Sequence, residues 1–147
     1  MRHITENGLR LIKKFEGFSD KIYLDSAGFQ TIGHGHLILP QEQQLYQNGI
    51  TEANAESLLK HDVTAAEKAV TSLINVPFTN HQFDSLVSFT FNLGAGALQR
   101  SALRRKVNRE EHTEVPAEFL RWVYAGSKKM PGLVRRRKAE AVLYSEN

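Results

Sequence analysis

The feature that most restricts the fold of this chain of 147 residues is an abrupt change in the pattern of apolar residues at Gly17. Before it, Ile4, Leu9, Ile12 and Phe15 fall near helical spacing. Residues 18–39 are instead rich in β-favouring side chains and in glycines that suit turns. From Thr51 the helical pattern returns and continues until Pro77. Strands enclosed between helical segments in this order predict an α+β fold.

We expect a single domain of residues 1–147 that is built from two lobes. The small N-terminal lobe, approximately residues 13–50, carries a short antiparallel sheet, and a long connecting helix follows over 51–75. A larger all-helical lobe over 76–147 packs with the N-terminal helix, with helices after the capping box at Thr79 and near 101–108, 116–125 and 132–144. A cleft between two lobes is a common place for an active site, and we expect the site there.

The chain contains no cysteine, which excludes disulfides, thiolate zinc sites and cysteine nucleophiles. The N-terminal residues alternate charged with apolar side chains and lack the continuous apolar core of a signal peptide. No apolar run is long enough for a membrane span. We therefore expect a soluble cytoplasmic protein that reaches an outside target only when something else releases it.

Charge is distributed unevenly along the chain. Residues 1–99 contain 7 basic and 10 acidic side chains, whereas residues 100–147 contain 12 basic and 6 acidic ones. The basic half is a candidate contact surface for a polyanion. Nucleic acid, an anionic membrane and a bacterial cell wall all meet that description.

The turn-rich stretch EGFSDKIYLDSAGFQTIGHGH, residues 16–36, concentrates the candidate catalytic groups. Glu16 is expected at a helix end, while Asp25 and Thr31 are expected on a hairpin. Glycoside hydrolysis needs two carboxyl groups on rigid elements, one to protonate the leaving oxygen and one to assist a water. A threonine hydroxyl can hold that water. Surface acids near turns are commonplace, so the residues alone leave a solvated, turn-capping role open.

The spacing E-x8-D-x5-T followed by IGHGH resembles the phage-type lysozymes, the endolysins of glycoside hydrolase family 24. Three more segments extend the resemblance over nearly the whole chain: ITEANAESLLKHDV, QFDSLVSFTFNLGAGAL and AGSKKMPGLVRRRKAEAVLY. Compared with the T-even phage members the chain is shorter before Thr51 and after Leu93, where it resembles the lambdoid members. The resemblance implies a lysozyme-like fold and a muramidase activity.

The resemblance also implies roles for individual residues. Glu16 is the general acid on the glycosidic oxygen, and Asp25 and Thr31 hold and activate a water that attacks with inversion. Asp20 lies outside the family spacing, so we interpret it as a turn residue. By position, the resemblance implies that His36 and Asp62 form a structural pair and that Arg135 reaches the acid. It also implies substrate contacts by Leu37, Phe91 and Ser101. We expect Trp122 in the helical core and His34 at the surface or lining the cleft.

Other interpretations remain open at this point. His34 and His36 would supply half of a metal site, but zinc needs three or four ligands, and we expect no metal and no cofactor. A nucleic-acid-binding module would use RSALRRKVNR and VRRRK, yet no recognised nucleic-acid motif is present. The basic C-terminal helix, with Leu133, Val134, Val142 and Leu143 on its other side, is a candidate for weak contact with anionic membranes. Docking of that helix on the lobe core is the alternative. For the arginine that reaches the acid, the alternative is a solvated helix face formed by Arg135, Arg136, Arg137 and Lys138, which suits Arg137 and Lys138 best.

The resulting hypothesis is an endolysin that hydrolyses the β-1,4 bond between N-acetylmuramic acid and N-acetylglucosamine in peptidoglycan during host lysis. We expect a monomer with no specific nucleic-acid partner. It would remain in the host cytoplasm until a holin permeabilises the inner membrane and would then act on the wall from the periplasm.

Overall fold

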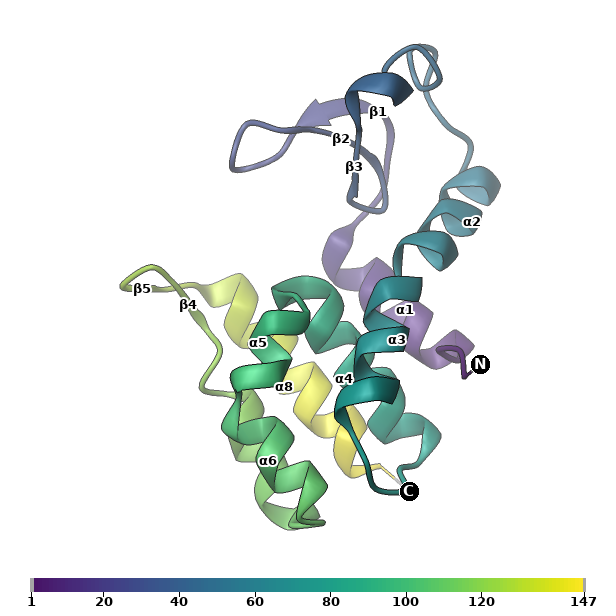
Figure 1. Cartoon of the computed structure of the whole chain (residues 1–147). Helices are drawn as coiled ribbons and strands as arrows, with labels where there is room; N and C mark the ends of the chain where they lie inside the picture. The colour runs from purple at the N-terminus through teal and green to yellow at the C-terminus, as the bar shows by residue number, and fades with distance from the viewer. Residues whose placement is uncertain (1, 147) are drawn as a thin grey trace. The chain divides into compact units, whose positions relative to one another are not determined.

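The computed structural model describes residues 2–146. The chain forms two compact units (Figure 1). The helical unit contains the residues up to Leu11 and those from Ala65 onward, and the sheet-bearing unit is Ile12–Thr64. In the described range no helix is both long and apolar enough to cross a membrane.

The sheet-bearing unit begins with the last turns of helix α1 (Glu6–Glu16), which ends at Gly17. Gly17 has a φ of 74°, a left-handed conformation that suits glycine and terminates helices. Three strands follow, β1 (Ser19–Leu24), β2 (Gln30–Gly33) and β3 (His36–Leu37), which form an antiparallel sheet in the order β1-β2-β3. The predicted small antiparallel sheet is therefore present.

A small apolar core holds this sheet in place. Ile32, Ile38 and Tyr46 are buried together, and three partly buried residues pack against them: Ile22, Ile50 and Leu58. Leu58 belongs to helix α2 (Glu52–Asp62), so α2 covers the sheet. A short 3-10 turn at Pro40–Glu42 connects β3 to the loop before α2.

The segment expected as one helix over 51–75 is helical with a single interruption. Helix α2 ends at Asp62 and helix α3 (Thr64–Leu73) begins two residues later. Val63, between them, keeps a right-handed helical conformation, and its N–H still donates to the carbonyl of Leu59. The side chain of Thr51 accepts a hydrogen bond from the N–H of Asn54 and caps α2.

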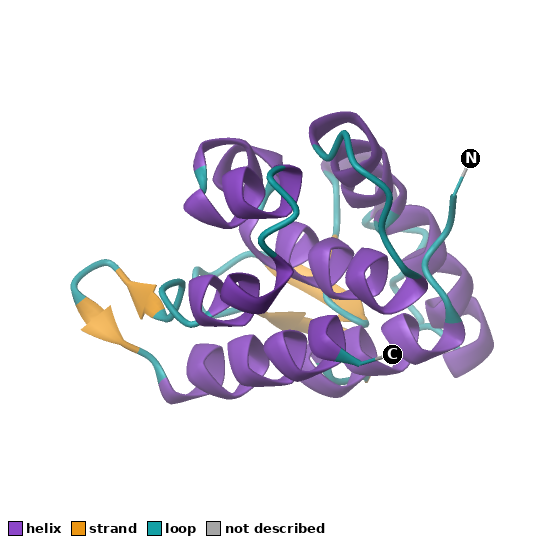
Figure 2. Ribbon diagram, turned by 90° about the horizontal axis from the view of Figure 1, so that it is seen from below, coloured by secondary structure: helices purple, strands orange, loops and turns teal. Residues whose placement is uncertain are grey.

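The helical unit is built around the apolar helix α4 (Asn80–Leu93), which packs along the C-terminal helix α8 (Pro131–Ser145). In Figure 2, α8 is the helix that ends beside the C label. Thr79 and Gln82 form the predicted capping box at the start of α4. The helices after α3 are α4 (Asn80–Leu93), α5 (Ala95–Arg100), α6 (Ala102–Asn108), α7 (Val115–Phe119) and α8 (Pro131–Ser145). A 3-10 turn, His112–Glu114, precedes α7.

One helix boundary differs from expectation. The helix expected over 116–125 ends at Phe119, and a two-stranded hairpin follows, β4 (Tyr124–Ala125) and β5 (Lys128–Lys129), so this lobe is not purely helical. Gly126 has a φ of 63° and occupies the hairpin turn instead of a helix end. A glycine at the first position of a two-residue loop is typical of tight hairpins, and this competing turn signal explains the difference.

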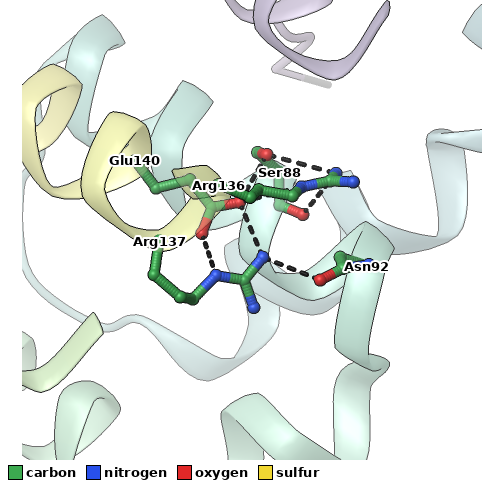
Figure 3. A network of polar contacts seen from close by, with 5 residues as sticks. All are labelled: Ser88, Asn92, Arg136, Arg137 and Glu140. Atoms are coloured by element: carbon green, nitrogen blue, oxygen red, sulfur yellow. Dashed lines mark hydrogen bonds and ion pairs between the residues drawn. The ribbon is translucent and has the colours of Figure 1, made fainter. Parts of the chain in front are cut away.

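A buried network of charges connects α8 to α4 (Figure 3). Arg136 is 4% exposed, and Arg137 and Glu140 are fully buried. The Glu140 carboxylate lies 2.7 Å from Arg137 Nε, and it accepts a hydrogen bond from the Ser88 hydroxyl at 2.6 Å. Arg137 Nη2 donates to Asn92 Oδ1 at 2.8 Å. The expectation that Arg137 belongs to a solvated face is therefore wrong, because α4 supplies partners that sequence periodicity does not reveal.

Replacing Glu140 with Gln is expected to destabilise the protein by about 3–5 kcal/mol, because two buried guanidinium groups would lose the carboxylate that they share. The free energy of unfolding from urea denaturation measures this loss. Lys138→Gln, on an exposed position of the same helix, should change stability by no more than about 0.5 kcal/mol. Equal stability of the two variants would show that the network contributes little.

Candidate active site

Glu16 lies at the last position of α1 and is half-buried. A Cβ atom built on Gly35 would lie 2.9 Å from Glu16 Oε1, so the carboxylate approaches the backbone of the β2–β3 turn closely. Gly35 also has a φ of 80°. The positive φ favours glycine at this position, and a side chain there would also displace the Glu16 carboxylate, which explains the second glycine of the IGHGH segment.

The Asp25 side chain is fixed by the turn that joins β1 to β2. Its Oδ1 atom accepts hydrogen bonds from the N–H of Ala27 at 2.9 Å and from the N–H of Phe29 at 2.8 Å. The N–H of Asp25 in turn donates to the carbonyl of Phe29 at 2.9 Å. Aspartate commonly organises turns in this way. Here the turn also holds a carboxylate in one orientation.

Thr31 lies on the central strand of the sheet, opposite Tyr23 of β1 and Leu37 of β3. It is 4% exposed, and its hydroxyl donates to the carbonyl of Phe29 at 3.0 Å. Because a hydroxyl has one proton to donate, Thr31 Oγ1 remains available as an acceptor. The peptide groups of Phe29 thus bind both Asp25 and Thr31, which brings these two predicted residues together.

Tyr23 was missed in the sequence, although it stands two residues before Asp25. Burial raises the pKa of its phenol, and the negative charges of Glu16 and Asp25 raise it further. The phenol therefore lies within electrostatic range of both carboxylates and keeps its proton at neutral pH. A protonated phenol is a hydrogen-bond donor for a carboxylate. The only sequence signal was the position of Tyr23 within the predicted strand.

Two histidines support the same region from the β2–β3 turn. His34 is 6% exposed, and its Nδ1 donates to the carbonyl of Gly17 at 2.7 Å, directly after Glu16. The expectation of a surface position for His34 is therefore wrong, because the side chain is buried. Within residues 2–146 no group of three or more His, Cys, Asp or Glu side chains has an arrangement that would hold a metal ion.

His36 lies between two carboxylates. Its Nδ1 is 2.7 Å from Asp62 Oδ2, the pairing that the family resemblance implies, and its Nε2 is 3.1 Å from Glu42 Oε1. Burial acts to lower the pKa of His36, but Asp62 and Glu42 outweigh it, and the pKa lies above the ordinary value of 6.5. The pKa of Glu42 is lowered, first by the N–H of Leu39 and then by His36. The cluster joins β3, the 3-10 turn and α2.

The remaining predicted site residues are distributed over both units. Leu37 is 49% exposed on β3. In the helical unit, Phe91 is half-buried near the end of α4 and Arg135 is exposed on the first turns of α8. Ser101 is buried, donates to the carbonyl of Leu98 at 2.8 Å and accepts from the N–H of Arg104 at 3.0 Å. The hydroxyl of Ser101 therefore serves as the cap of α6.

The α+β fold thus carries a carboxylate at the end of α1, a carboxylate held by the β1–β2 turn and a threonine on β2. The family model described as phage lysozyme matches residues 13–140, and the chain belongs to this family. It is an enzyme of the lysozyme type.

Individual relatives agree with this assignment. The endolysin of Acyrthosiphon pisum secondary endosymbiont phage 1 is 36% identical over 146 residues, which cover 97% of each chain. The muramidase domain of SpmX from Asticaccaulis excentricus has a TM-score of 0.86 at 33% identity, covering 99% of this chain and all of that one. A mutant of P22 lysozyme has the same TM-score at 32% identity and the same coverage.

The contribution of His36 to stability should depend on pH. A pKa raised by folding means that this contribution is complete below pH 6.5 and is lost as the pH rises through the folded-state value. His36→Gln should therefore lower the free energy of unfolding more at pH 6 than at pH 9, as measured by urea denaturation. A pH-independent loss for His36→Gln would contradict the charged-pair assignment.

Proposed function

We propose that this phage lysozyme family member is an endolysin that hydrolyses the β-1,4 bond between N-acetylmuramic acid and N-acetylglucosamine in peptidoglycan. Glu16 protonates the leaving oxygen, and Asp25 with Thr31 holds and activates the attacking water. The observation that carries the catalytic assignment is the shared attachment of Asp25 and Thr31 to the backbone of Phe29. The relatives described above, an endolysin, a muramidase domain and a lysozyme, support the substrate.

The hydrogen-bonding capacity of the site supports a water-activating role. One oxygen of Asp25 is occupied by two N–H groups, and the other makes no hydrogen bond within residues 2–146. Thr31 Oγ1 donates to the backbone and can only accept from a water. A water that donates one proton to Asp25 and the other to Thr31 keeps a lone pair for attack on the anomeric carbon.

Attack by this water leads to inversion at the anomeric carbon. The leaving oxygen departs with a proton from Glu16 while Asp25 accepts a proton from the water, so no covalent intermediate forms. Inverting glycosidases separate their two carboxyl groups by roughly 6.5–9.5 Å to leave room for the water. Burial and the charges of Glu16 and Asp25 raise the pKa of Tyr23, so its phenol stays neutral and can donate a hydrogen bond in this region.

The cell wall is the target, and the route to it is part of the proposal. The chain would accumulate in the host cytoplasm as a monomer and reach the periplasm when a holin permeabilises the inner membrane. The excess of basic residues after Arg100 suits a wall that carries carboxylates.

Two other uses of the basic residues are less well supported. In RSALRRKVNR, Arg104 Nε donates to the carbonyl of Leu73 and Lys106 pairs with Glu118 at 3.1 Å, so part of this charge is used within the helical unit and not for nucleic acid. Burial of Arg136 and Arg137 likewise removes two charges on which a membrane-active C-terminal helix would depend. Weak membrane contact would rest on the exposed Arg135 and Lys138.

Glu16→Gln should reduce the rate of lysis of chloroform-treated Gram-negative cells by about 10²–10⁴-fold, because the variant cannot donate the proton. Mass analysis of the digested wall identifies the bond, and the wild-type enzyme should yield fragments with N-acetylmuramic acid at the reducing end. Glu6→Gln, in the exposed first turn of the same helix, should retain full activity. Substantial lysis by Glu16→Gln would overturn the acid assignment, and cleavage of peptide or amide bonds would overturn the proposed function.

A further inference from the structure

We propose that a groove on the sheet-bearing unit, distinct from Glu16, Asp25 and Thr31, binds a short peptide that carries both an ammonium and a carboxylate group. The inference rests on the proposed function, since peptidoglycan carries peptides of this chemistry along its glycan. The groove would thereby hold the wall while the catalytic residues act on the sugar chain.

The groove is formed by the start of β1, the loop 45–51 and one face of α2, and its volume is about 650 Å³. Sites for small ligands usually range from about 300 to 1,000 Å³. The α2 wall consists of residues at positions i, i+3, i+4 and i+7, which share one face of a helix: Asn54, Ser57, Leu58 and His61. None of the three proposed catalytic residues lines the groove.

The backbone holds this groove in a preformed shape. Gly49 has a φ of 93°, and a Cβ atom there would lie 2.5 Å from the carbonyl oxygen of Asp20, so the loop contacts β1 directly. The N–H of Ile50 donates to the same carbonyl at 2.9 Å, and Thr51 caps α2. Binding to a preformed site is more favourable than binding to a site that must first rearrange, because no free energy is needed to order its segments.

The groove combines an apolar surface with unused amide side chains. Leu45, Ile50 and Leu58 supply apolar lining, and Leu45 is 71% exposed. The carboxamides of Asn48 and Asn54 make no hydrogen bond to any other residue between 2 and 146. A carboxamide both donates and accepts, which matches the N–H and C=O groups of a peptide backbone.

Charge favours a peptide over a neutral sugar. Asp20 and Lys21 both line the groove, and within the described chain neither side chain has an ion-pair partner. Successive strand residues normally point to opposite faces, but the register of β1 against β2 shifts between Ser19 and Tyr23. This irregularity interrupts the strict alternation at the point where both residues line the groove. A carboxylate and an ammonium group complement the opposite charges of a zwitterionic peptide, whereas a chain of neutral N-acetyl sugars would use neither.

Titration of the wild-type protein with the tripeptide L-Ala-γ-D-Glu-meso-diaminopimelate, followed by amide NMR, tests the proposal. Saturable shifts are expected at Asn48, Gly49, Asn54 and His61. Asn48→Ala, Asn54→Ala and Lys21→Gln should each weaken binding by about tenfold. Gln47→Ala is the matched control, because Gln47 is an exposed carboxamide of the same loop that does not line the groove, and it should bind as the wild type does.

Chitotriose, a neutral N-acetyl sugar oligomer, is the competing probe. Shifts at the same amides with chitotriose but not with the tripeptide would overturn the peptide assignment, and so would the absence of saturable shifts with the tripeptide. In activity assays, the three groove variants should raise KM about tenfold on intact sacculi and leave cleavage of peptide-free glycan unchanged. Peptide binding is measured without turnover, so a protein that binds the tripeptide but does not cleave the wall would refute the proposed function alone.

Discussion

The proposed chemistry depends on one short turn, in which the peptide groups of Phe29 bind both Asp25 and Thr31. The N–H of Phe29 fixes a carboxylate oxygen, and its carbonyl accepts both the Asp25 N–H and the Thr31 hydroxyl. Because these groups are already hydrogen-bonded, the second oxygen of Asp25 and a lone pair of Thr31 Oγ1 remain to accept protons from a water. The short strands of the sheet then serve mainly to hold this turn, and the small core under Ile32 keeps the strands in register.

The acid is positioned by different means. Glu16 is the last residue of a helix, and two glycines determine where its carboxylate lies. Gly17 terminates the helix, and Gly35 leaves room beside the carboxylate because it has no side chain. His34 then binds the carbonyl of Gly17 and joins this helix end to the β2–β3 turn. Two separate rigid elements therefore present the two carboxylates, and the negative charge of each raises the pKa of Tyr23. Such preorganisation suits a reaction in which charge develops at a defined position.

Local sequence pattern predicted the parts of this structure that local forces determine. The switch from helical to strand periodicity at Gly17, the capping box at Thr79 and the small sheet are examples. The family resemblance added the candidate roles of Glu16, Asp25 and Thr31, which residue types alone left open. Tyr23 was not recognised, because its relevance comes from two charges at other positions that only the folded strand brings near.

The unexpected features arise from contacts between distant segments. The basic run at 135–138 has the pattern of a solvated helix face, yet Ser88 and Asn92, on another helix, bury two of its arginines. His34 lies in a polar turn, yet it is buried and its Nδ1 donates to the carbonyl of Gly17, 17 residues earlier in the chain. The hairpin after Phe119 shows that a glycine can satisfy either a helix end or a tight turn, and the neighbouring segments decide between them.

The stereochemistry of the first product tests the central claim most directly, because it reports whether a water held by Asp25 and Thr31 attacks opposite the leaving group. Proton NMR during the first minutes of cleavage of a soluble peptidoglycan fragment follows the new reducing end before it equilibrates. The account predicts that the α-anomer appears first. Initial appearance of the β-anomer would contradict it, since that outcome requires a covalent or substrate-assisted intermediate and not direct attack by water.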